Sequence, residues 1–209
     1  MEVEVWSDVV CPWCFIGKRR LESALASFPG GEEVVVRHRA FQLDPGAVSA
    51  GRPTVDVLAE KYAIDREQAI EMMSDVTDVA AEVGLRYQLD RTLSGNTRDA
   101  HRVLLWAQER GFGPALLESM FTAYFEQGQP VFTLTDVEPL LTGVGLDAAE
   151  AQEMLAGDSF EADVLSDQAL AGQLGARGVP FFVVDRKVGV AGAQPEAVLV
   201  SALEQAAAG

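Results

Sequence analysis

The polarity pattern changes its period near the start of the chain. Residues 2–7 alternate between acidic and mostly apolar side chains, which predicts a β-strand. Between residues 21 and 28 the apolar side chains recur every three or four positions, as on one face of an amphipathic helix. Pro12 suits the first turn of that helix, and a Pro-Gly-Gly sequence at residues 29–31 ends it. A run of valines leads a second strand over residues 34–41, so this order predicts a βαβ unit with parallel strands.

The middle of the chain has helical periodicity instead. Residues 44–53 are rich in Pro, Gly and small side chains, which is typical of a connector. Beyond the connector, strand signals nearly vanish and apolar stripes predict a series of helices. They lie over residues 54–62, around 76–83 in a longer helix that stops at Gly84, and over about 96–111, 117–128, 136–141 and 147–156. We therefore predict an all-helical insertion domain over residues 51–157.

Strand signals return in the last part of the chain. We expect a helix over residues 159–175, strands over 179–184 and 188–191, and a last helix that starts at Pro195. The full order is βαβ, helical insert, αββα, which predicts an α/β fold. Its sheet-containing domain is then discontinuous, with residues 1–50 and 158–209 on either side of the insertion.

The charge balance argues against several classes of partner. The chain has 16 basic and 32 acidic residues, a formal charge of −16. This charge repels phosphates and anionic lipid headgroups, so we expect neither nucleic acid nor a membrane as partner. The first residues lack the basic and apolar regions of a secretory signal, and no apolar run reaches membrane-spanning length. We therefore expect a cytoplasmic protein, in which a Cys-x-x-Cys pair is more suited to redox cycling than to a static disulfide.

The only two cysteines of the sequence form one motif, Cys11-Pro12-Trp13-Cys14, at the start of the first predicted helix. Free N–H groups and the positive end of the helix dipole favour a thiolate there. We expect Cys11 to be the exposed nucleophile and Cys14, one turn further, to be the more buried resolving thiol. The alternatives are inert buried cysteines or half of a metal site between subunits. Two ligands are too few for a closed zinc site, so we expect no metal.

Six ordered segments place the motif in a wider pattern. They are Ser7–Cys14, Ile16–Arg19, Phe41–Leu43, Asn96–Arg102, Gly178–Pro180 and Gly192–Pro195. Together they resemble the DsbA family, which has a thioredoxin fold with a helical insertion, and within it the FrnE-like branch. The resemblance spans nearly the whole chain, and it implies a thiol–disulfide oxidoreductase.

The resemblance also implies a substrate-binding surface beside the dithiol. In the thioredoxin fold the proline equivalent to Pro180 is cis and lies against the dithiol, and the backbone before it, here Val179, pairs with an extended substrate. Pro12 and Trp13 complete this surface. From the residues alone, Pro180 is an ordinary trans proline at the start of a strand. DsbA has a histidine where this chain has Trp13, and an indole cannot supply the positive charge of an imidazolium, so we expect a less oxidising couple.

Four further polar residues are candidates for supporting roles. Asp8 is a candidate buried acid that exchanges protons with Cys14, although a solvated or turn-capping aspartate fits the sequence equally well. His101 belongs to a segment that the resemblance places near the active face, where it could orient a substrate or a low-molecular-weight thiol. A histidine on a helix surface with no catalytic role is the simpler interpretation. Arg102 and Gln194 have the same two interpretations, a role at the active face or none.

Three functions remain compatible with these patterns. The first is a cytoplasmic thiol–disulfide oxidoreductase that acts on a thiol- or disulfide-containing protein or small molecule. It would have no tightly bound cofactor, with glutathione or mycothiol as a candidate redox partner. The second is a glutathione-dependent enzyme of the kappa-transferase or 2-hydroxychromene-2-carboxylate isomerase type, but these relatives typically have a serine in place of Cys11. The third is a holdase-like peptide-binding protein. The sequence leaves open the direction of electron flow and the choice between monomer and homodimer.

Overall fold

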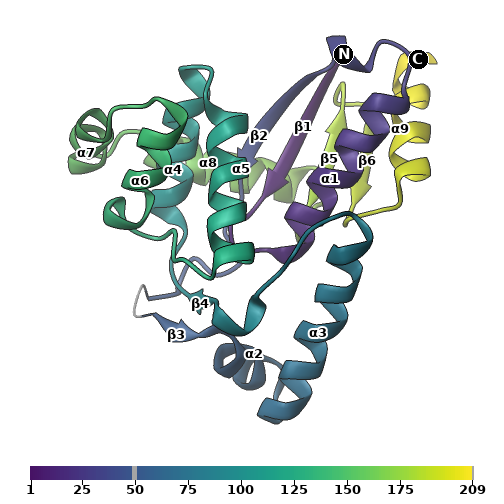
Figure 1. The fold of residues 1–209 in the computed structure, drawn as a ribbon. Coiled ribbons are helices and arrows are strands. Elements are labelled where there is room, and N and C mark those ends of the chain that lie inside the picture. Colours follow the sequence, from purple (N-terminus) through teal and green to yellow (C-terminus); the bar gives the residue numbers. More distant parts are fainter. Residues whose placement is uncertain (49–50, 209) are drawn as a thin grey trace.

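The computed structural model describes residues 1–48 and 51–208, and it is built on a four-stranded sheet of order β2-β1-β5-β6 (Figure 1). β1 (Glu2–Ser7) runs parallel to β2 (Val35–Ala40) and antiparallel to β5 (Phe181–Val184). β6 (Val188–Ala191) pairs antiparallel with β5 at the edge of the sheet. The crossover between β1 and β2 is α1 (Pro12–Ser27). The predicted βαβ unit and the α/β class are therefore confirmed.

Helices cover both faces of this sheet, because its central strands alternate apolar side chains between the two sides. Val3 and Val5 of β1 face α1 and the last helix, α9 (Glu196–Ala208), in one apolar cluster. Trp6 points to the opposite face, in a cluster with Ala171 of α8 (Glu161–Gln173). The indole of Trp6 also donates a hydrogen bond of 2.8 Å to the carbonyl oxygen of Asp167 on α8.

The insertion between β2 and α8 is helical except for one short ladder. Its helices are α2 (Thr54–Tyr62), α3 (Arg66–Glu82), α4 (Arg98–Glu109), α5 (Gly113–Phe121), α6 (Leu134–Val144) and α7 (Ala148–Ala156). α5 continues into a π-helical turn over Thr122–Glu126, and short 3₁₀ turns lie at Gly31–Glu33 and Leu89–Arg91. The strands β3 (Arg52–Pro53) and β4 (Leu93–Ser94) pair antiparallel and were not expected, since strands of two residues leave no alternation in the sequence.

Several helix bounds differ from the sequence prediction, and α3 is one of them. α3 begins at Arg66, well before the apolar stretch that indicated it, because Asp65 and Gln68 form a reciprocal capping box at its start. The division of the chain into two domains remains a prediction, and residues 50 and 209, which bound the predicted segments, lie outside the described residues.

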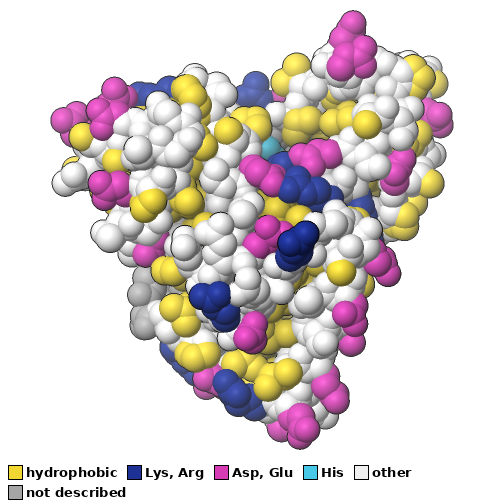
Figure 2. All heavy atoms as spheres, viewed as in Figure 1, with side chains coloured by type: hydrophobic (Ala, Val, Ile, Leu, Met, Phe, Trp, Pro, Cys, Tyr) yellow, Lys and Arg dark blue, Asp and Glu magenta, His cyan; other side chains and the backbone are white. Residues whose placement is uncertain are grey.

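The negative charge is spread over the surface, with one concentration along α3. Acidic side chains line the edge of the molecule that this helix forms (Figure 2). The exposed carboxylates on α3 are Glu67, Glu71, Asp75, Asp78 and Glu82. In the part of the chain that the structure describes, no helix is both long and apolar enough to cross a membrane.

Candidate active site

The two cysteines lie where β1 gives way to α1. Cys11 is the N-cap residue of α1, Pro12 follows at the first helical position, and Cys14 is in the first turn. The backbone N–H of Cys11 donates to the carbonyl oxygen of Asp8 at 3.0 Å, and that of Cys14 donates to the carbonyl oxygen of Cys11 at 2.9 Å. Both side chains are free thiols. The turn at Asp8 and the proline at the helix start thus present two thiols within one helical turn.

Neither thiol is exposed, although an exposed Cys11 was expected. Cys11 is 4% exposed and Cys14 is 3% exposed. The Sγ of Cys11 donates to the carbonyl oxygen of Val179 at 3.5 Å, so the segment before β5 covers it. Burial raises the pKa of Cys14 well above its usual value, and the hydrogen bond and charge of Cys11 raise it further. Cys14 is therefore held as a neutral thiol.

The segment that covers Cys11 contains a cis peptide bond, between Val179 and Pro180. Gly17 of α1 makes this close approach possible. A Cβ atom at Gly17 would lie 2.9 Å from the Cγ of Pro180 and 3.1 Å from the ring of Phe182, which is too close for any larger residue. Gly17 was itself a sign of this contact in the sequence. A glycine inside a helix is destabilising, so its presence there indicates that close packing requires it.

A cleft opens beside the dithiol, between α1, the Val179 segment, α2 and α3. Its volume is about 540 Å³, and most of its lining is apolar. Trp13 lies in this lining with 39% of its surface exposed. The charged side chains in the lining are Lys61 and Asp75, from α2 and α3. The residues predicted to bind substrate, Pro12, Trp13 and Val179, line this cleft, while Pro180 is buried beside it.

Asp8 and His101 form a buried pair behind the dithiol. Each is 1% exposed, so a solvated Asp8 and a surface His101 are both wrong. One carboxylate oxygen of Asp8, Oδ2, accepts a hydrogen bond of 2.8 Å from the backbone N–H of Leu43. The other, Oδ1, lies 3.4 Å from Nε2 of His101, and neither atom forms a hydrogen bond with any described residue. Buried polar atoms without partners are rare in folded proteins, so this pair requires an explanation.

The two remaining polar candidates lie away from the dithiol. Arg102 is buried and donates to the backbone carbonyl oxygens of Ser159 and Gly157, at 2.9 and 2.6 Å, so it fastens α4 to the segment before α8. The amide of Gln194 donates to the carbonyl oxygen of Ala191 at 2.9 Å, within its own turn. Both contacts are structural.

Tyr87 contacts the motif and was missed from the sequence. Its hydroxyl donates a hydrogen bond of 2.7 Å to the carbonyl oxygen of Pro12, between the two cysteines. Its ring stacks on Phe125 and Phe15, with centroids 4.9 and 6.2 Å away. Tyr87 lies in no recognisable motif, and the contact joins residues 75 positions apart, so no local pattern indicated it.

Comparison with known proteins identifies the family at this point. The sequence profile of the DSBA-like thioredoxin domain matches residues 2–204. The chain belongs to the DsbA-like thioredoxin domain family. This is a family of thiol–disulfide oxidoreductases, so the Cys11–Cys14 pair of this DsbA-like chain is a dithiol within a redox-enzyme scaffold.

Three solved structures are similar to this DsbA-like protein over almost its whole length. A probable DsbA oxidoreductase from Streptomyces coelicolor is 43% identical with a TM-score of 0.94, and the match covers 100% of this chain and 90% of that one. The cytosolic disulfide reductase DsbM from Pseudomonas aeruginosa, solved with GSH, is 19% identical with a TM-score of 0.66, covering 100% and 96% of the two chains. A 2-hydroxychromene-2-carboxylate isomerase is 14% identical with a TM-score of 0.72, covering 98% and 95%. At such identities the last two show a shared fold only.

The chemistry available to this DsbA-like site is that of the two thiols and the groups around them. Among residues 1–48 and 51–208, no three His, Cys, Asp or Glu side chains come together as a metal site would require. A thiol at a helix start and a second thiol within one turn are groups that can take part in thiol–disulfide exchange, and a buried carboxylate lies nearby.

Proposed function

We propose that this protein is a cytoplasmic protein-disulfide oxidoreductase in which Cys11 is the nucleophile and Cys14 the resolving thiol. The observation that carries the proposal is the placement of two free thiols in the first turn of α1, beside the cis peptide bond at Pro180 and at one end of an apolar cleft. A cytoplasmic location suits a dithiol that cycles, and DsbM, which shares the fold, is described as cytosolic.

In the reducing direction the reaction is two successive exchanges. The Cys11 thiolate attacks one sulfur of a substrate disulfide, forms a mixed disulfide and releases the other sulfur as a thiolate, which takes up a proton. Cys14 then loses its proton and attacks Sγ of Cys11, which releases the second substrate thiolate. The substrate gains two electrons and the enzyme is left with a Cys11–Cys14 disulfide. The oxidising direction is the reverse, with a substrate dithiol reducing that disulfide.

Asp8 is the proposed proton acceptor for Cys14. Burial raises the pKa of Cys14, so this thiol needs a base before it can attack the mixed disulfide. The charge of Asp8 acts on Cys14, and Oδ1 of Asp8 has no hydrogen-bond donor among the described residues. His101, whose Nε2 lies 3.4 Å from that oxygen, is the proposed partner of the carboxylate in this role.

The cleft is the proposed binding site for an extended polypeptide. Its apolar lining fits the side chains around a substrate cysteine, while Val179 offers backbone groups to an extended chain. Trp13, half-exposed at the cleft, supplies apolar contact beside the nucleophile. We propose no tightly bound cofactor, and a low-molecular-weight thiol such as glutathione or mycothiol as the redox partner. Because Trp13 cannot carry a positive charge, we expect a measured potential below that of DsbA, which has a histidine there.

The test is to replace Cys14 with alanine and to identify what remains attached to Cys11. Without the resolving thiol, mixed disulfides accumulate, and the proposal predicts protein adducts on Cys11 that a reductant releases. The control is the double variant Cys11→Ala with Cys14→Ala, which must trap nothing. Small-thiol adducts alone would favour the glutathione-dependent alternative. Absence of any adduct would contradict the proposal, and retention of peptide binding by the double variant without redox activity in the wild type would indicate a holdase.

A further inference from the structure

The insertion touches the dithiol motif through the hydroxyl of Tyr87. This residue follows α3, is 7% exposed and donates its 2.7 Å hydrogen bond to the carbonyl oxygen of Pro12. Burial raises the pKa of Tyr87 far above its usual value, with the charges of Cys11 and Cys14 as further causes. The hydroxyl therefore keeps its proton at neutral pH and remains a donor, close enough to both cysteines to interact with their charges.

The position of this hydroxyl is held by the packing of the Tyr87 ring against two aromatic side chains. The ring of Tyr87 stacks at 28° on Phe125 of the insertion, 4.9 Å away, and at 22° on Phe15 of α1, 6.2 Å away. Phe15 directly follows Cys14 and is fully buried. A tyrosine held between α1 and the insertion in this way cannot move its hydroxyl from Pro12 without disturbing the packing of both.

The bonded carbonyl belongs to the same peptide group as the N–H of Trp13. In the helix α1, Cys11 is the N-cap residue and Trp13 occupies the second helical position. The N–H at that position has no partner within the helix, and an acceptor on the N-cap side chain is its usual partner. A hydrogen bond to the carbonyl oxygen polarises the whole peptide group and makes its N–H a better donor. As a thiol, Cys11 directs its Sγ to the carbonyl oxygen of Val179 and makes no N-cap hydrogen bond. Once Cys11 loses its proton, the N–H of Trp13 is the helix-start donor that its thiolate would use.

We propose that Tyr87 is a positioning residue through which the insertion stabilises the thiolate of Cys11, by way of the peptide group between Pro12 and Trp13. The inference rests on the proposed function, because it concerns the reactivity of the proposed nucleophile. It assigns the insertion a part in setting the reactivity of the dithiol, in addition to forming one wall of the cleft.

Several other charged or titratable groups surround Cys11, and all of them are retained when Tyr87 loses only its hydroxyl. Cys14 shares α1 with it, and Asp8 lies in the preceding turn. The charged and titratable side chains that line the cleft with Cys11 are Lys61, Tyr62, Asp75 and Tyr124. A change in the Cys11 titration on removal of the Tyr87 hydroxyl therefore reports on its hydrogen bond to Pro12.

The experiment is the pH profile of Cys11 alkylation in reduced wild type and Tyr87→Phe, with the modified cysteine identified by mass spectrometry. Dipolar stabilisation at a helix start is worth about 0.3–1 kcal/mol, so the alkylation rate at neutral pH should fall roughly two- to fivefold. The midpoint of the profile should move upward by about 0.2–0.7 pH units, and the dithiol should become more reducing. A loss of structure alone would not shift a midpoint measured on folded protein.

Tyr124→Phe is the matched control. Tyr124 is also a buried tyrosine against Phe125, but its hydroxyl donates to the carbonyl oxygen of Leu93 at 2.6 Å, within the insertion. Tyr124 also lines the cleft, but burial raises its pKa to about 12, so its hydroxyl carries no charge at neutral pH. Its loss should leave the Cys11 midpoint unchanged. Equal midpoints in wild type and Tyr87→Phe, or equal shifts in the two variants, would overturn the inference while leaving the proposed function intact. If Cys11 reacted neither in the wild type nor in either variant, both the inference and the proposed function would be overturned.

Should Tyr87→Phe not fold, a fluorinated tyrosine at position 87 provides a second measurement. Fluorine beside the hydroxyl makes it a stronger donor and leaves its hydrogen bond to Pro12 in place. The Cys11 midpoint must then move downward. A midpoint equal to or above that of the wild type would contradict the role of Tyr87.

Discussion

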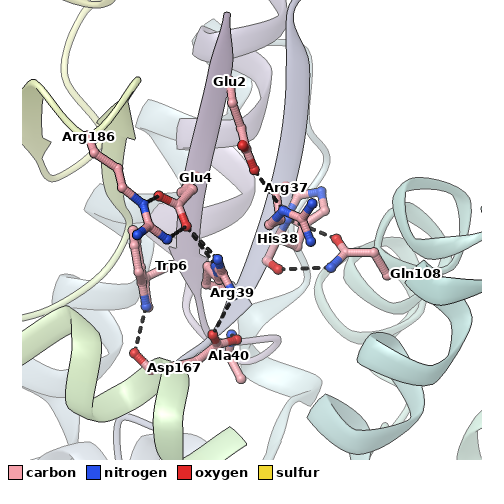
Figure 3. A network of polar contacts seen from close by, with 10 residues as sticks. All are labelled: Glu2, Glu4, Trp6, Arg37, His38, Arg39, Ala40, Gln108, Asp167 and Arg186. Carbon is pink, nitrogen blue, oxygen red and sulfur yellow. Dashed lines mark hydrogen bonds and ion pairs between the residues drawn. The ribbon is translucent and has the colours of Figure 1, made fainter. Parts of the chain in front are cut away.

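Two buried clusters of charged side chains lie on different parts of this fold, and they differ in how completely their polar atoms are paired. In the first, Glu4 of β1 receives hydrogen bonds from Arg39 and Arg186, while Asp167 of α8 receives them from Arg39 and from the N–H of Ala40 (Figure 3). All four carboxylate oxygens in this network have at least one donor, at 2.6–3.0 Å. Its outer end reaches solvent, since the side chain of Arg186 is 64% exposed.

In the second cluster, behind the dithiol, the pairing is incomplete. Asp8 has one bonded oxygen and one without a donor, and the facing Nε2 of His101 has no hydrogen bond among the described residues. Both side chains are 1% exposed. The difference indicates what each cluster is for. A paired network fastens α8 to the sheet, whereas a buried group left without a partner costs free energy, which makes Asp8 and His101 candidates for a functional role.

The two clusters also differ in how they shift the pKa values of their ionisable groups. Burial alone would raise the pKa of Glu4, but hydrogen bonds and charges from Arg186 and Arg39 outweigh it and lower the pKa below its usual value. Burial raises the pKa of Cys14, and the charge of the nearby Asp8 adds to the increase, with only a backbone hydrogen bond at Asp8 opposing it. The first cluster thus stabilises the ionised form of Glu4, although burial raises the pKa of Asp167 in the same network. The second keeps a thiol neutral until a base removes its proton.

Replacing Asp8 with asparagine gives the largest expected effect. Asparagine keeps an acceptor for the N–H of Leu43 but cannot take the proton of Cys14, so resolution of a mixed disulfide should slow by about 100-fold or more. Loss of the Asp8 charge also lowers the pKa of Cys14, which offsets part of this effect. The measurement is the rate of substrate release from a pre-formed mixed disulfide by rapid quench. The free energy of unfolding should be unchanged or higher, and a resolution rate equal to that of the wild type would remove Asp8 from the mechanism.

His38 tests whether a missing partner is enough to mark a functional group. Its Nδ1 has no hydrogen bond among the described residues, yet His38 lies on β2 (Figure 3) and is not among the residues that line the cleft beside the dithiol. Burial, with a smaller contribution from the charge of Lys18, lowers the pKa of His38 from 6.5 to about 4. Because the unfolded chain binds a proton at higher pH than the folded one, stability is complete above pH 6.5 and is lost as the pH falls toward 4.

The expected loss from this histidine is about 3 kcal/mol, since each unit of pKa difference is worth about 1.4 kcal/mol. His38→Leu should therefore flatten the fall in unfolding free energy across that pH range, as measured by urea denaturation at several pH values. Turnover at neutral pH should stay that of the wild type, because His38 has no part in the proposed mechanism and does not line the cleft. A large loss of turnover would mean that His38 belongs to the site.

Part of this fold and of the candidate site could be predicted from the sequence, and part could not. Local periodicity was enough for β1, for α2 and for β6, whose observed bounds match the predicted ones. The dithiol and the candidates Asp8 and His101 were also named from the sequence. What could not be obtained was their environment, because whether Asp8 is solvated or buried depends on α4, which lies far along the chain.

The missed features have the same physical origin. Cys11 is buried by the segment at Val179, which lies 168 residues away, and Tyr87 reaches Pro12 across 75 residues. A composition or period computed over a short window contains no information on such contacts. Gly17 is the exception, since a glycine within a helical stretch is a local sign of close packing.

Glu4→Gln tests the paired cluster and is the matched control for Asp8→Asn. Both changes remove one buried carboxylate charge and keep the shape of the side chain. At Glu4 the change weakens the hydrogen bonds of two guanidinium groups, so the free energy of unfolding should fall by about 2 kcal/mol while resolution by Cys14 is unaffected. Because the pKa of Glu4 is lowered, its contribution is present above its usual value of 4.5 and lost as the pH falls through the folded value. Urea denaturation should therefore show the difference at neutral pH and not in acid.

Substitutions of Arg186 should have the smallest effect on stability. Two of them together distinguish the contribution of the ion pair from that of the backbone conformation at the exposed end of the paired cluster. Its guanidinium is largely solvated, so the ion pair with Glu4 contributes little and is screened by salt. Arg186 and Asp185 form the tight turn between β5 and β6 with positive φ angles of 55° and 46°, a conformation that favours glycine. Arg186→Ala loses the ion pair and keeps the unfavourable backbone, so its melting temperature should fall slightly at low salt. Arg186→Gly loses the same ion pair but relieves the backbone, so it should melt above Arg186→Ala at any salt concentration. If the two variants melt together below the wild type, the ion pair and not the turn controls stability at this end of the network.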